Sequence, residues 1–97
     1  MKLAVTPKIA AKLEEKHGVS VKEVWQCFEN RAGGLLEDTR EQHRTNPPTQ
    51  WFIGETNKGR KLKVAFIQSQ TPAGLRIDLR TAYEPNTEEI RIYEKFG

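Results

Sequence analysis

The sequence lacks the features that mark several classes of protein. Cys27 is the only cysteine among 97 residues, so no internal disulfide can form and nothing indicates an oxidising compartment. No apolar run approaches the roughly 20 residues that span a bilayer, and the segment 1–7 is too short for the apolar core of a signal peptide. We therefore expect a cytoplasmic protein with no membrane partner.

Signs of a metal or a cofactor are also missing. The single cysteine and the two histidines, His17 and His43, lie in separate segments and match no known ligand spacing. Gly33 and Gly34 lack the strand and the motif of a phosphate-binding loop. Cys27 falls on an apolar helical face, where a core position is expected rather than a nucleophile. The sequence thus predicts a protein that uses no cofactor.

The composition that is present is typical of one small globular domain. Hydrophobic residues make up 36% of the chain, which separates it from the apolar-poor composition of disordered proteins. A chain of 97 residues is long enough for one core and too short for two. We expect residues 1–97 to form a single domain.

Start and stop signals predict seven elements. Thr6 and Pro7 begin a first helix, and Ser20 with Glu23 forms a capping box for a second one. The expected order is a strand over 1–5, helices over 7–17 and from 21 to the glycines at 33–34, strands over 50–56, 61–69 and 75–83, and a last helix capped by Asn86. This order predicts an α+β fold with a small, mainly antiparallel sheet, while 35–48 is expected to be a long exposed loop.

Positive charge is concentrated in one part of the chain. The net charge of +3 is modest, but six basic residues face the single acidic residue Asp78 between positions 56 and 82. A local excess of this kind can attract phosphates even in a nearly neutral protein. The six are Lys58, Arg60, Lys61, Lys63, Arg76 and Arg80.

Strand alternation sorts these side chains onto one face. Lys61 and Lys63 fall opposite the apolar residues of their strand, as do Arg76, Asp78 and Arg80 on the next strand. If the two strands pair as a hairpin, the four basic residues form one surface around the aspartate. Guanidinium groups bind phosphates, and fixed charge stabilises a phosphoryl-transfer transition state. The alternative is plain solvation, since a sheet with one wet face normally carries charged residues there.

The two histidines allow two interpretations each. His17 lies beside Gly18 at a helix end, where a cation interacts favourably with the helix dipole, so capping competes with a catalytic role. His43 lies in the polar segment with Arg40 and Arg44, which could supply an acid or a base or could be a solvated loop.

Several short motifs resemble the BrnT-like toxins of bacterial toxin-antitoxin pairs. The segment 16–20, Lys-His-Gly-Val-Ser, followed by Glu23, is similar to the Lys-His-Gly-Val-Ser/Thr-x-x-Glu motif between the first two helices of that family. Residues 53–54 and 59–64 resemble the family's glycine-arginine hairpin, 77–82 resemble its strand that ends in an arginine before an alanine, and 89–94 resemble its last helix. The resemblance covers nearly the whole chain.

The resemblance implies the RelE-like fold, metal-independent RNA cleavage, and inhibition by a cognate antitoxin protein. RNA, free or on the ribosome, is then the expected substrate. In this interpretation Arg80 and Arg76 hold the scissile phosphate, Lys61 or Lys63 neutralises developing charge, and His17 or His43 transfers a proton. Further RNA contacts are expected from Lys58, Arg60, Lys63, Arg40 and Arg44.

One segment departs from the family pattern. Members usually have an acidic residue and an arginine just before the second strand, where this chain has Pro-Pro-Thr-Gln at 47–50. Arg40 or Arg44 are the candidates to replace that arginine. The same basic face would also suit a non-catalytic module that binds RNA or an acidic or amphipathic protein segment.

Similar chains are sometimes labelled ADP-ribosyl-dinitrogen-reductase hydrolases. That reaction is expected to need an acidic metal-binding cluster, and the sequence contains no such cluster. We therefore favour the ribonuclease interpretation over this label.

Overall fold

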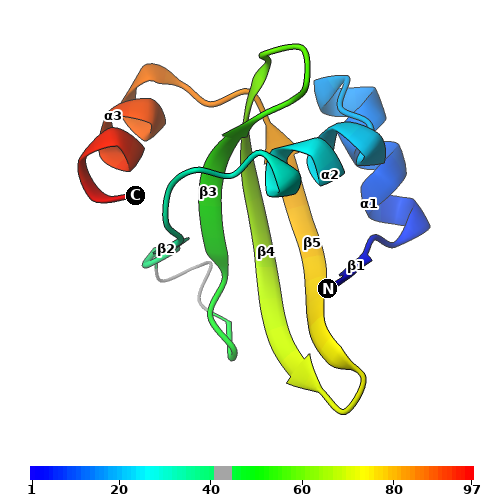
Figure 1. Ribbon diagram of the computed structural model, residues 1–97. Helices are drawn as coiled ribbons and strands as arrows, with labels where there is room; N and C mark the ends of the chain where they lie inside the picture. Colours follow the sequence, from blue (N-terminus) through cyan, green and yellow to red (C-terminus); the bar gives the residue numbers. More distant parts are fainter. Residues whose placement is uncertain (41–44) are drawn as a thin grey trace.

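Five strands form one sheet, in the order β1-β5-β4-β3-β2 (Figure 1). The computed structural model describes residues 1–40 and 45–97. Strand β1 lies parallel to β5, and all other neighbours pair antiparallel. The expected mixed α+β class and mainly antiparallel sheet are therefore confirmed. The strands are β1 (Lys2–Ala4), β2 (Leu36–Glu37), β3 (Gln50–Glu55), β4 (Lys61–Thr71) and β5 (Gly74–Tyr83).

Two helices cover one face of this sheet, and a third lies beyond β3 (Figure 1). They are α1 (Pro7–Lys12), which continues into the π-helical turn η1 (Leu13–His17), then α2 (Val21–Glu29), and α3 (Thr87–Phe96). None of the helices in the described part of the chain is long and apolar enough to cross a membrane.

The helices begin where the capping signals predict. Ser20 Oγ accepts a hydrogen bond from the Glu23 N–H, and the Glu23 carboxylate accepts one from the Ser20 N–H. Asn86 and Glu89 form the same reciprocal pair at the start of α3. The first pair of helices is separated by Gly18, whose φ of 59° places it in the left-handed region that closes a helix.

The segment between α2 and β3 differs from the expectation. A two-residue strand, β2, lies where only a loop is expected, because Leu36 pairs with Trp51 at the edge of the sheet. The expected order of elements is therefore wrong by one strand. Such a short strand has too few residues to show alternation in the sequence. His43 and Arg44 lie outside the described residues.

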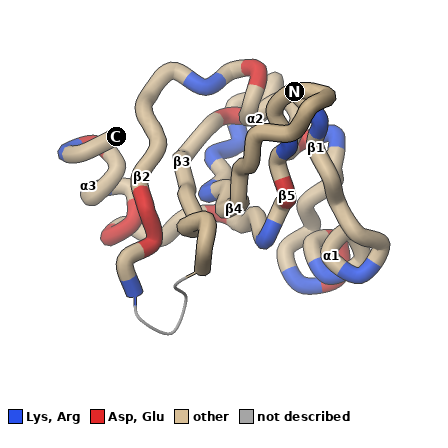
Figure 2. The backbone as a smooth tube through the Cα atoms, turned by 90° about the horizontal axis from the view of Figure 1, so that it is seen from below, with Lys and Arg blue, Asp and Glu red and all other residues tan. Residues whose placement is uncertain are grey.

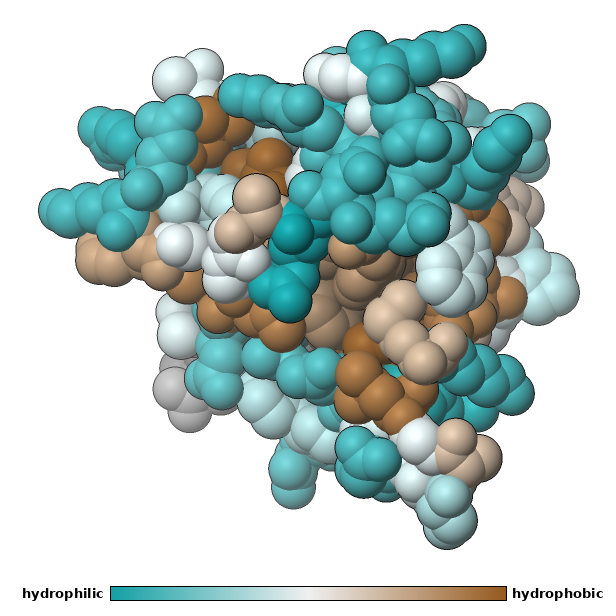
Figure 3. All heavy atoms as spheres, viewed as in Figure 1, coloured by the Kyte–Doolittle hydropathy of each residue, from teal (hydrophilic) through white to brown (hydrophobic). Residues whose placement is uncertain are grey.

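The core lies between the sheet and the two N-terminal helices. Val24 and Cys27 of α2 are fully buried and belong to one cluster with Phe52 and Val64 from β3 and β4. The core position expected for Cys27 is therefore confirmed. Figure 3 shows hydrophilic side chains over much of this face, with hydrophobic ones gathered near its middle. The opposite face of the sheet is free of α1 and α2.

Candidate nucleic-acid interface

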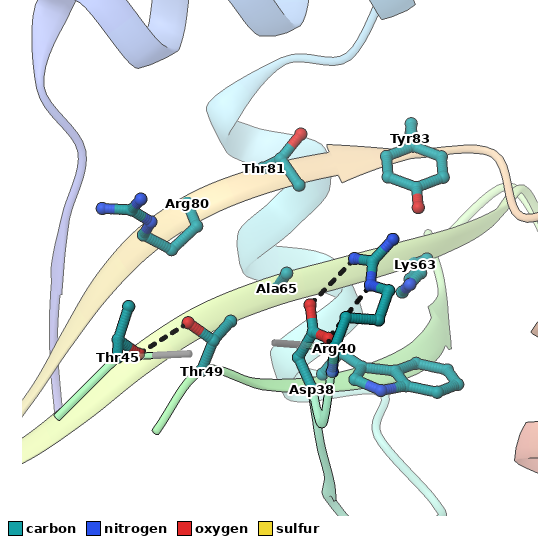
Figure 4. Close-up of a pocket in the computed structure, with 10 residues that line it drawn as sticks. Asp38, Arg40, Thr45, Thr49, Lys63, Ala65, Arg80, Thr81 and Tyr83 are labelled. Atoms are coloured by element: carbon teal, nitrogen blue, oxygen red, sulfur yellow. Dashed lines mark hydrogen bonds and ion pairs between the residues drawn. The ribbon is translucent and has the colours of Figure 1, made fainter. Parts of the chain in front are cut away.

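A hollow of about 380 Å³ lies on the face of the sheet away from α2 (Figure 4). Its floor and walls come from three adjacent strands, which contribute Trp51, Lys63, Ala65, Thr81 and Tyr83, and from Thr49, which directly precedes β3. The segment after β2 closes one side with Asp38 and Arg40. Arg80 lies at the end of the hollow opposite Tyr83 (Figure 4). Aromatic, hydroxyl and basic groups therefore meet in one place.

A β-bulge determines how β5 contributes to this hollow. Phe66 pairs with Leu79 and Ala65 pairs with Thr81, so Arg80 is an extra residue in β5. The bulge interrupts the alternation of the strand, and Arg80 and Thr81 both line the hollow as consecutive residues. The sequence predicts that Arg80 is exposed on the polar face, which is correct, but the alternation rule places Thr81 on the other face. The bulge has no distinct sequence signal.

Lys63 is not part of an exposed basic surface. Its side chain is only 9% exposed, and its Nζ donates to Glu89 Oε2 of α3 at 2.8 Å. The ammonium also lies 4.5 Å from the ring centre of Trp51 and 5.7 Å from that of Tyr83. The expectation of an exposed Lys63 is therefore wrong. Strand alternation alone predicts that this side chain lies in solvent, but two aromatic rings and α3 cover it.

Tyr83 and Glu89 form a polar pair with this lysine. The Tyr83 hydroxyl donates to the same Glu89 oxygen at 2.7 Å. Burial, together with this hydrogen bond, raises the pKa of Tyr83 to about 12. Burial also acts to raise the pKa of Glu89, but hydrogen bonds from Lys63 and the Asn86 N–H outweigh it and hold that pKa below its usual value. At neutral pH the tyrosine is therefore a proton donor and the glutamate is an anion.

An acidic residue and an arginine do meet at this hollow. Arg40 donates from Nε and Nη2 to the two carboxylate oxygens of Asp38, at 3.1 and 2.8 Å (Figure 4). The pair lies just after β2 rather than at the Pro-Pro-Thr-Gln segment. The hydrogen bond to Asp38 raises the pKa of Arg40, so the guanidinium stays charged. Of the two candidates to replace the family's arginine, Arg40 is thus placed at the hollow, and Arg44 lies outside the described residues.

Arg80 differs from the other arginines that the structure describes. Arg40, Arg60, Arg76 and Arg91 each contact a carboxylate, and Arg31 donates to a backbone carbonyl. Arg80 is exposed and forms no ion pair or side-chain hydrogen bond within residues 1–40 and 45–97. Among the arginines of the described ranges, its guanidinium is therefore the one whose donors are available for a ligand.

His17 lies on the other side of Arg80. A second hollow, of about 190 Å³, is lined by both residues and also by Thr81 and Leu13. The imidazole ring centre is 5.5 Å from that of Tyr83. The structure thus brings together His17 and Arg80, which are 63 positions apart in the sequence numbering.

Arg60 connects the β3–β4 hairpin to the junction between η1 and α2. Its guanidinium donates to the carbonyl oxygens of Gly18 and His17, at 2.9 and 3.1 Å, and to the carboxylates of Glu23 and Glu84, at 3.1 and 2.9 Å. Partial burial acts against its charge, but the hydrogen bonds to the two glutamates prevail and raise the pKa of Arg60. All these donors are used within the protein, so the contacts indicate a positioning role for this residue.

The remaining basic candidates lie apart from the hollow. Arg76 holds Asp78 with three hydrogen bonds of 3.0 to 3.1 Å, towards the other end of β5. Lys61 lies opposite Glu55 at the end of the β3–β4 hairpin, and Lys58 is exposed in its turn. The single basic surface expected from the sequence is therefore wrong. Carboxylates neutralise parts of it, and the length of the strands separates the rest.

In the described ranges no three histidine, cysteine, aspartate or glutamate side chains lie close enough together to hold a metal ion. The chain matches no protein-family model, and a comparison with curated proteins finds no significant match.

Sequence reasoning missed several residues of the hollow. Thr45 and Thr49 share a hydrogen bond of 2.9 Å between their hydroxyl oxygens at its rim. Tyr83 and Glu89 join Lys63 only through the packing of α3 against the sheet. Glu89 has a recognisable signal, but that signal is for helix capping and gives no hint of the contact with Lys63.

Proposed function

We propose that this chain binds single-stranded RNA on the open face of the sheet and cleaves it without a metal ion. The motifs that resemble those of BrnT-like toxins support this proposal. The observation that carries it is Arg80, which has no partner in the described part of the chain and stands at the junction of two hollows. A free guanidinium in a concave site is suited to a phosphate because it can donate two parallel hydrogen bonds.

The surrounding groups fit the chemistry of RNA cleavage. In this reaction the ribose 2′-hydroxyl gives up its proton and forms a bond to the neighbouring phosphorus, the bond from phosphorus to the 5′ oxygen breaks, and that oxygen takes up a proton, so that a 2′,3′-cyclic phosphate and a 5′-hydroxyl result. Arg80 would stabilise the extra negative charge on the phosphoryl oxygens. His17, in the adjoining hollow, is the residue placed to transfer a proton.

Incubation of the purified chain with a generic RNA in the presence of EDTA tests this function. We expect fragments with 2′,3′-cyclic phosphate ends, and no cleavage of DNA of the same sequence, because DNA lacks the attacking hydroxyl. Binding should weaken steeply as salt rises, since bound phosphates release counterions. Intact RNA together with no binding at low salt would contradict the proposal.

A second candidate function is binding of a protein partner. An apolar hollow of about 740 Å³ lies beside α3, and it is lined by Leu35, Leu36, Ile92 and Phe96. Phe96 is 64% exposed, which is unusual for a large aromatic residue. An antitoxin-like protein would use such a groove. RNA binding without cleavage, combined with a growth effect that disappears when an antitoxin is co-expressed, would favour this function over catalysis.

A further inference from the structure

The hollow between α1 and β5 has an unusual set of charges. Lys12, Lys16 and His17 line it from the helical side and Arg80 lines it from the sheet. No acidic residue is among the described residues of its lining. Figure 2 shows basic residues, all of them lysines, recurring along α1 and the turn that follows it, with acidic residues among them. Three cationic side chains around a hollow of about 190 Å³ are expected to attract an anion.

Helix geometry explains why the two lysines act together. Lys12 ends α1 and Lys16 lies four positions later in η1, a spacing that places side chains on the same side of a helix. Both residues are exposed. Glu14 and Glu15, the acidic residues of this turn, do not line the hollow. Solvation accounts for exposed lysines, but it does not explain why both line the same hollow as Arg80.

The end of a helix normally disfavours an anion, because its last carbonyl groups carry partial negative charge. Here Arg60 satisfies two of these carbonyl groups. Its guanidinium donates to the carbonyl oxygens of His17 and Gly18, at 3.1 and 2.9 Å. The same guanidinium is paired with Glu23 and Glu84, so the attraction for an anion comes from the lysines and Arg80.

The bulge in β5 connects this hollow with the larger one. Arg80 and Thr81 line both, so one extended ligand can contact both hollows through the same arginine. A polymer with a phosphate at every unit fits this arrangement better than a single small anion does. The chemistry therefore favours a nucleic-acid strand that passes over Arg80.

We infer that Lys12 and Lys16 form a second phosphate subsite, which holds a backbone phosphate of single-stranded RNA next to the one at Arg80. The inference rests on the proposed RNA-binding function. It adds the direction in which the RNA strand leaves the face of the sheet that lies away from α2. The strand runs from the sheet hollow across Arg80 and Thr81 towards α1.

The test measures binding of a labelled single-stranded uridine oligomer of about 10 nucleotides, at several salt concentrations, by fluorescence anisotropy. Loss of one phosphate contact lowers the slope of log K against log salt by about 0.7 for a single strand, so the double variant Lys12→Gln/Lys16→Gln, which removes the one phosphate contact of this subsite, should lower it by about 0.7. The matched control is Lys22→Gln/Lys95→Gln, which removes the same charge from residues outside both hollows.

Each outcome decides a different point. A lower slope for the first variant, with a control close to the wild-type chain and equal melting temperatures, supports the subsite. Equal slopes for both variants overturn the subsite but leave RNA binding by the wild-type chain intact. A wild-type chain that does not bind the oligomer overturns the proposed function and the subsite together. If a polyglutamate peptide displaces the oligomer at equal charge concentration, the hollow belongs to an acidic protein segment and the inference is wrong.

Discussion

Arg60 holds the carboxylate of Glu23 at 3.1 Å across 37 positions of the sequence. Glu23 already accepts the Ser20 N–H in the capping box of α2, and this hydrogen bond, with a contribution from Arg60, keeps its pKa below the usual value. The same guanidinium reaches back to the carbonyl of His17. Two of the segments that resemble BrnT-like proteins, the one around residues 16–23 and the one that contains Arg60, are thus joined by hydrogen bonds. These hydrogen bonds hold the turn that follows His17.

Replacement of Arg60 tests these hydrogen bonds. We expect Arg60→Gln to lower the free energy of unfolding by about 1–2 kcal/mol, because hydrogen bonds to charged groups are lost from a site that remains partly exposed. Arg60→Lys should not restore the wild-type value, because one ammonium group cannot replace the planar guanidinium that reaches all these acceptors. Chemical denaturation is the measurement.

The matched control is Arg31→Gln, which removes a guanidinium whose side chain donates only to the Gly33 carbonyl among the described residues. A loss of stability as large as that of Arg60→Gln would show that the effect is general to surface arginines. Such a result would contradict the special role of Arg60.

The capping residues and strand alternation made much of the fold predictable from the sequence. Ser20, Glu23 and Asn86 begin helices where expected, because capping depends on residues close together in the chain. The candidate site was only partly predictable. The partners of Lys63 come from β3, β5 and α3, and no local pattern encodes such a contact. Arg80 was identified correctly as an exposed residue, but its setting between two hollows depends on a bulge.

Gly54 allows a prediction about packing between α2 and β3. A Cβ atom at this position would lie 2.8 Å from the Cys27 carbonyl oxygen and 2.8 Å from the Phe52 ring. Gly54→Ala should therefore lower the free energy of unfolding by about 1–3 kcal/mol, the usual cost of overpacking a core. In Gly34→Ala, the control, the new atom would meet only the Gly97 carbonyl carbon, at 3.5 Å. A Gly54→Ala protein as stable as this control would show that α2 does not pack closely on β3.

Glu89 predicts how stability depends on pH. Its pKa in the folded chain lies below its usual value of 4.5, because hydrogen bonds outweigh the effect of burial. A carboxyl group of this kind contributes stability above its unfolded pKa and loses that contribution as the pH falls through the folded pKa. The wild-type chain should therefore lose stability as the pH falls below 4.5.

Glu89→Gln should remove part of this dependence and should also destabilise the chain at neutral pH, because it leaves the Lys63 ammonium without its counter-ion. Denaturation curves at a series of pH values test both effects. Glu94→Gln, a nearby change on the same helix, is the control. If the Glu89→Gln protein keeps the full pH dependence, Glu89 is not the group that titrates.

The most direct test of the central claim is RNA cleavage by an Arg80→Ala protein, measured together with its melting temperature. Arg80 is exposed and makes no ion pair in the part of the chain that is described, so its removal should leave the melting temperature unchanged. Cleavage should fall by at least about 10²-fold, the scale for loss of one group that stabilises transition-state charge. Arg91→Ala, which removes an exposed guanidinium from α3, should cleave as the wild-type chain does. An Arg80→Ala protein that cleaves as fast as the Arg91→Ala control, or that loses activity only together with its fold, would contradict the account.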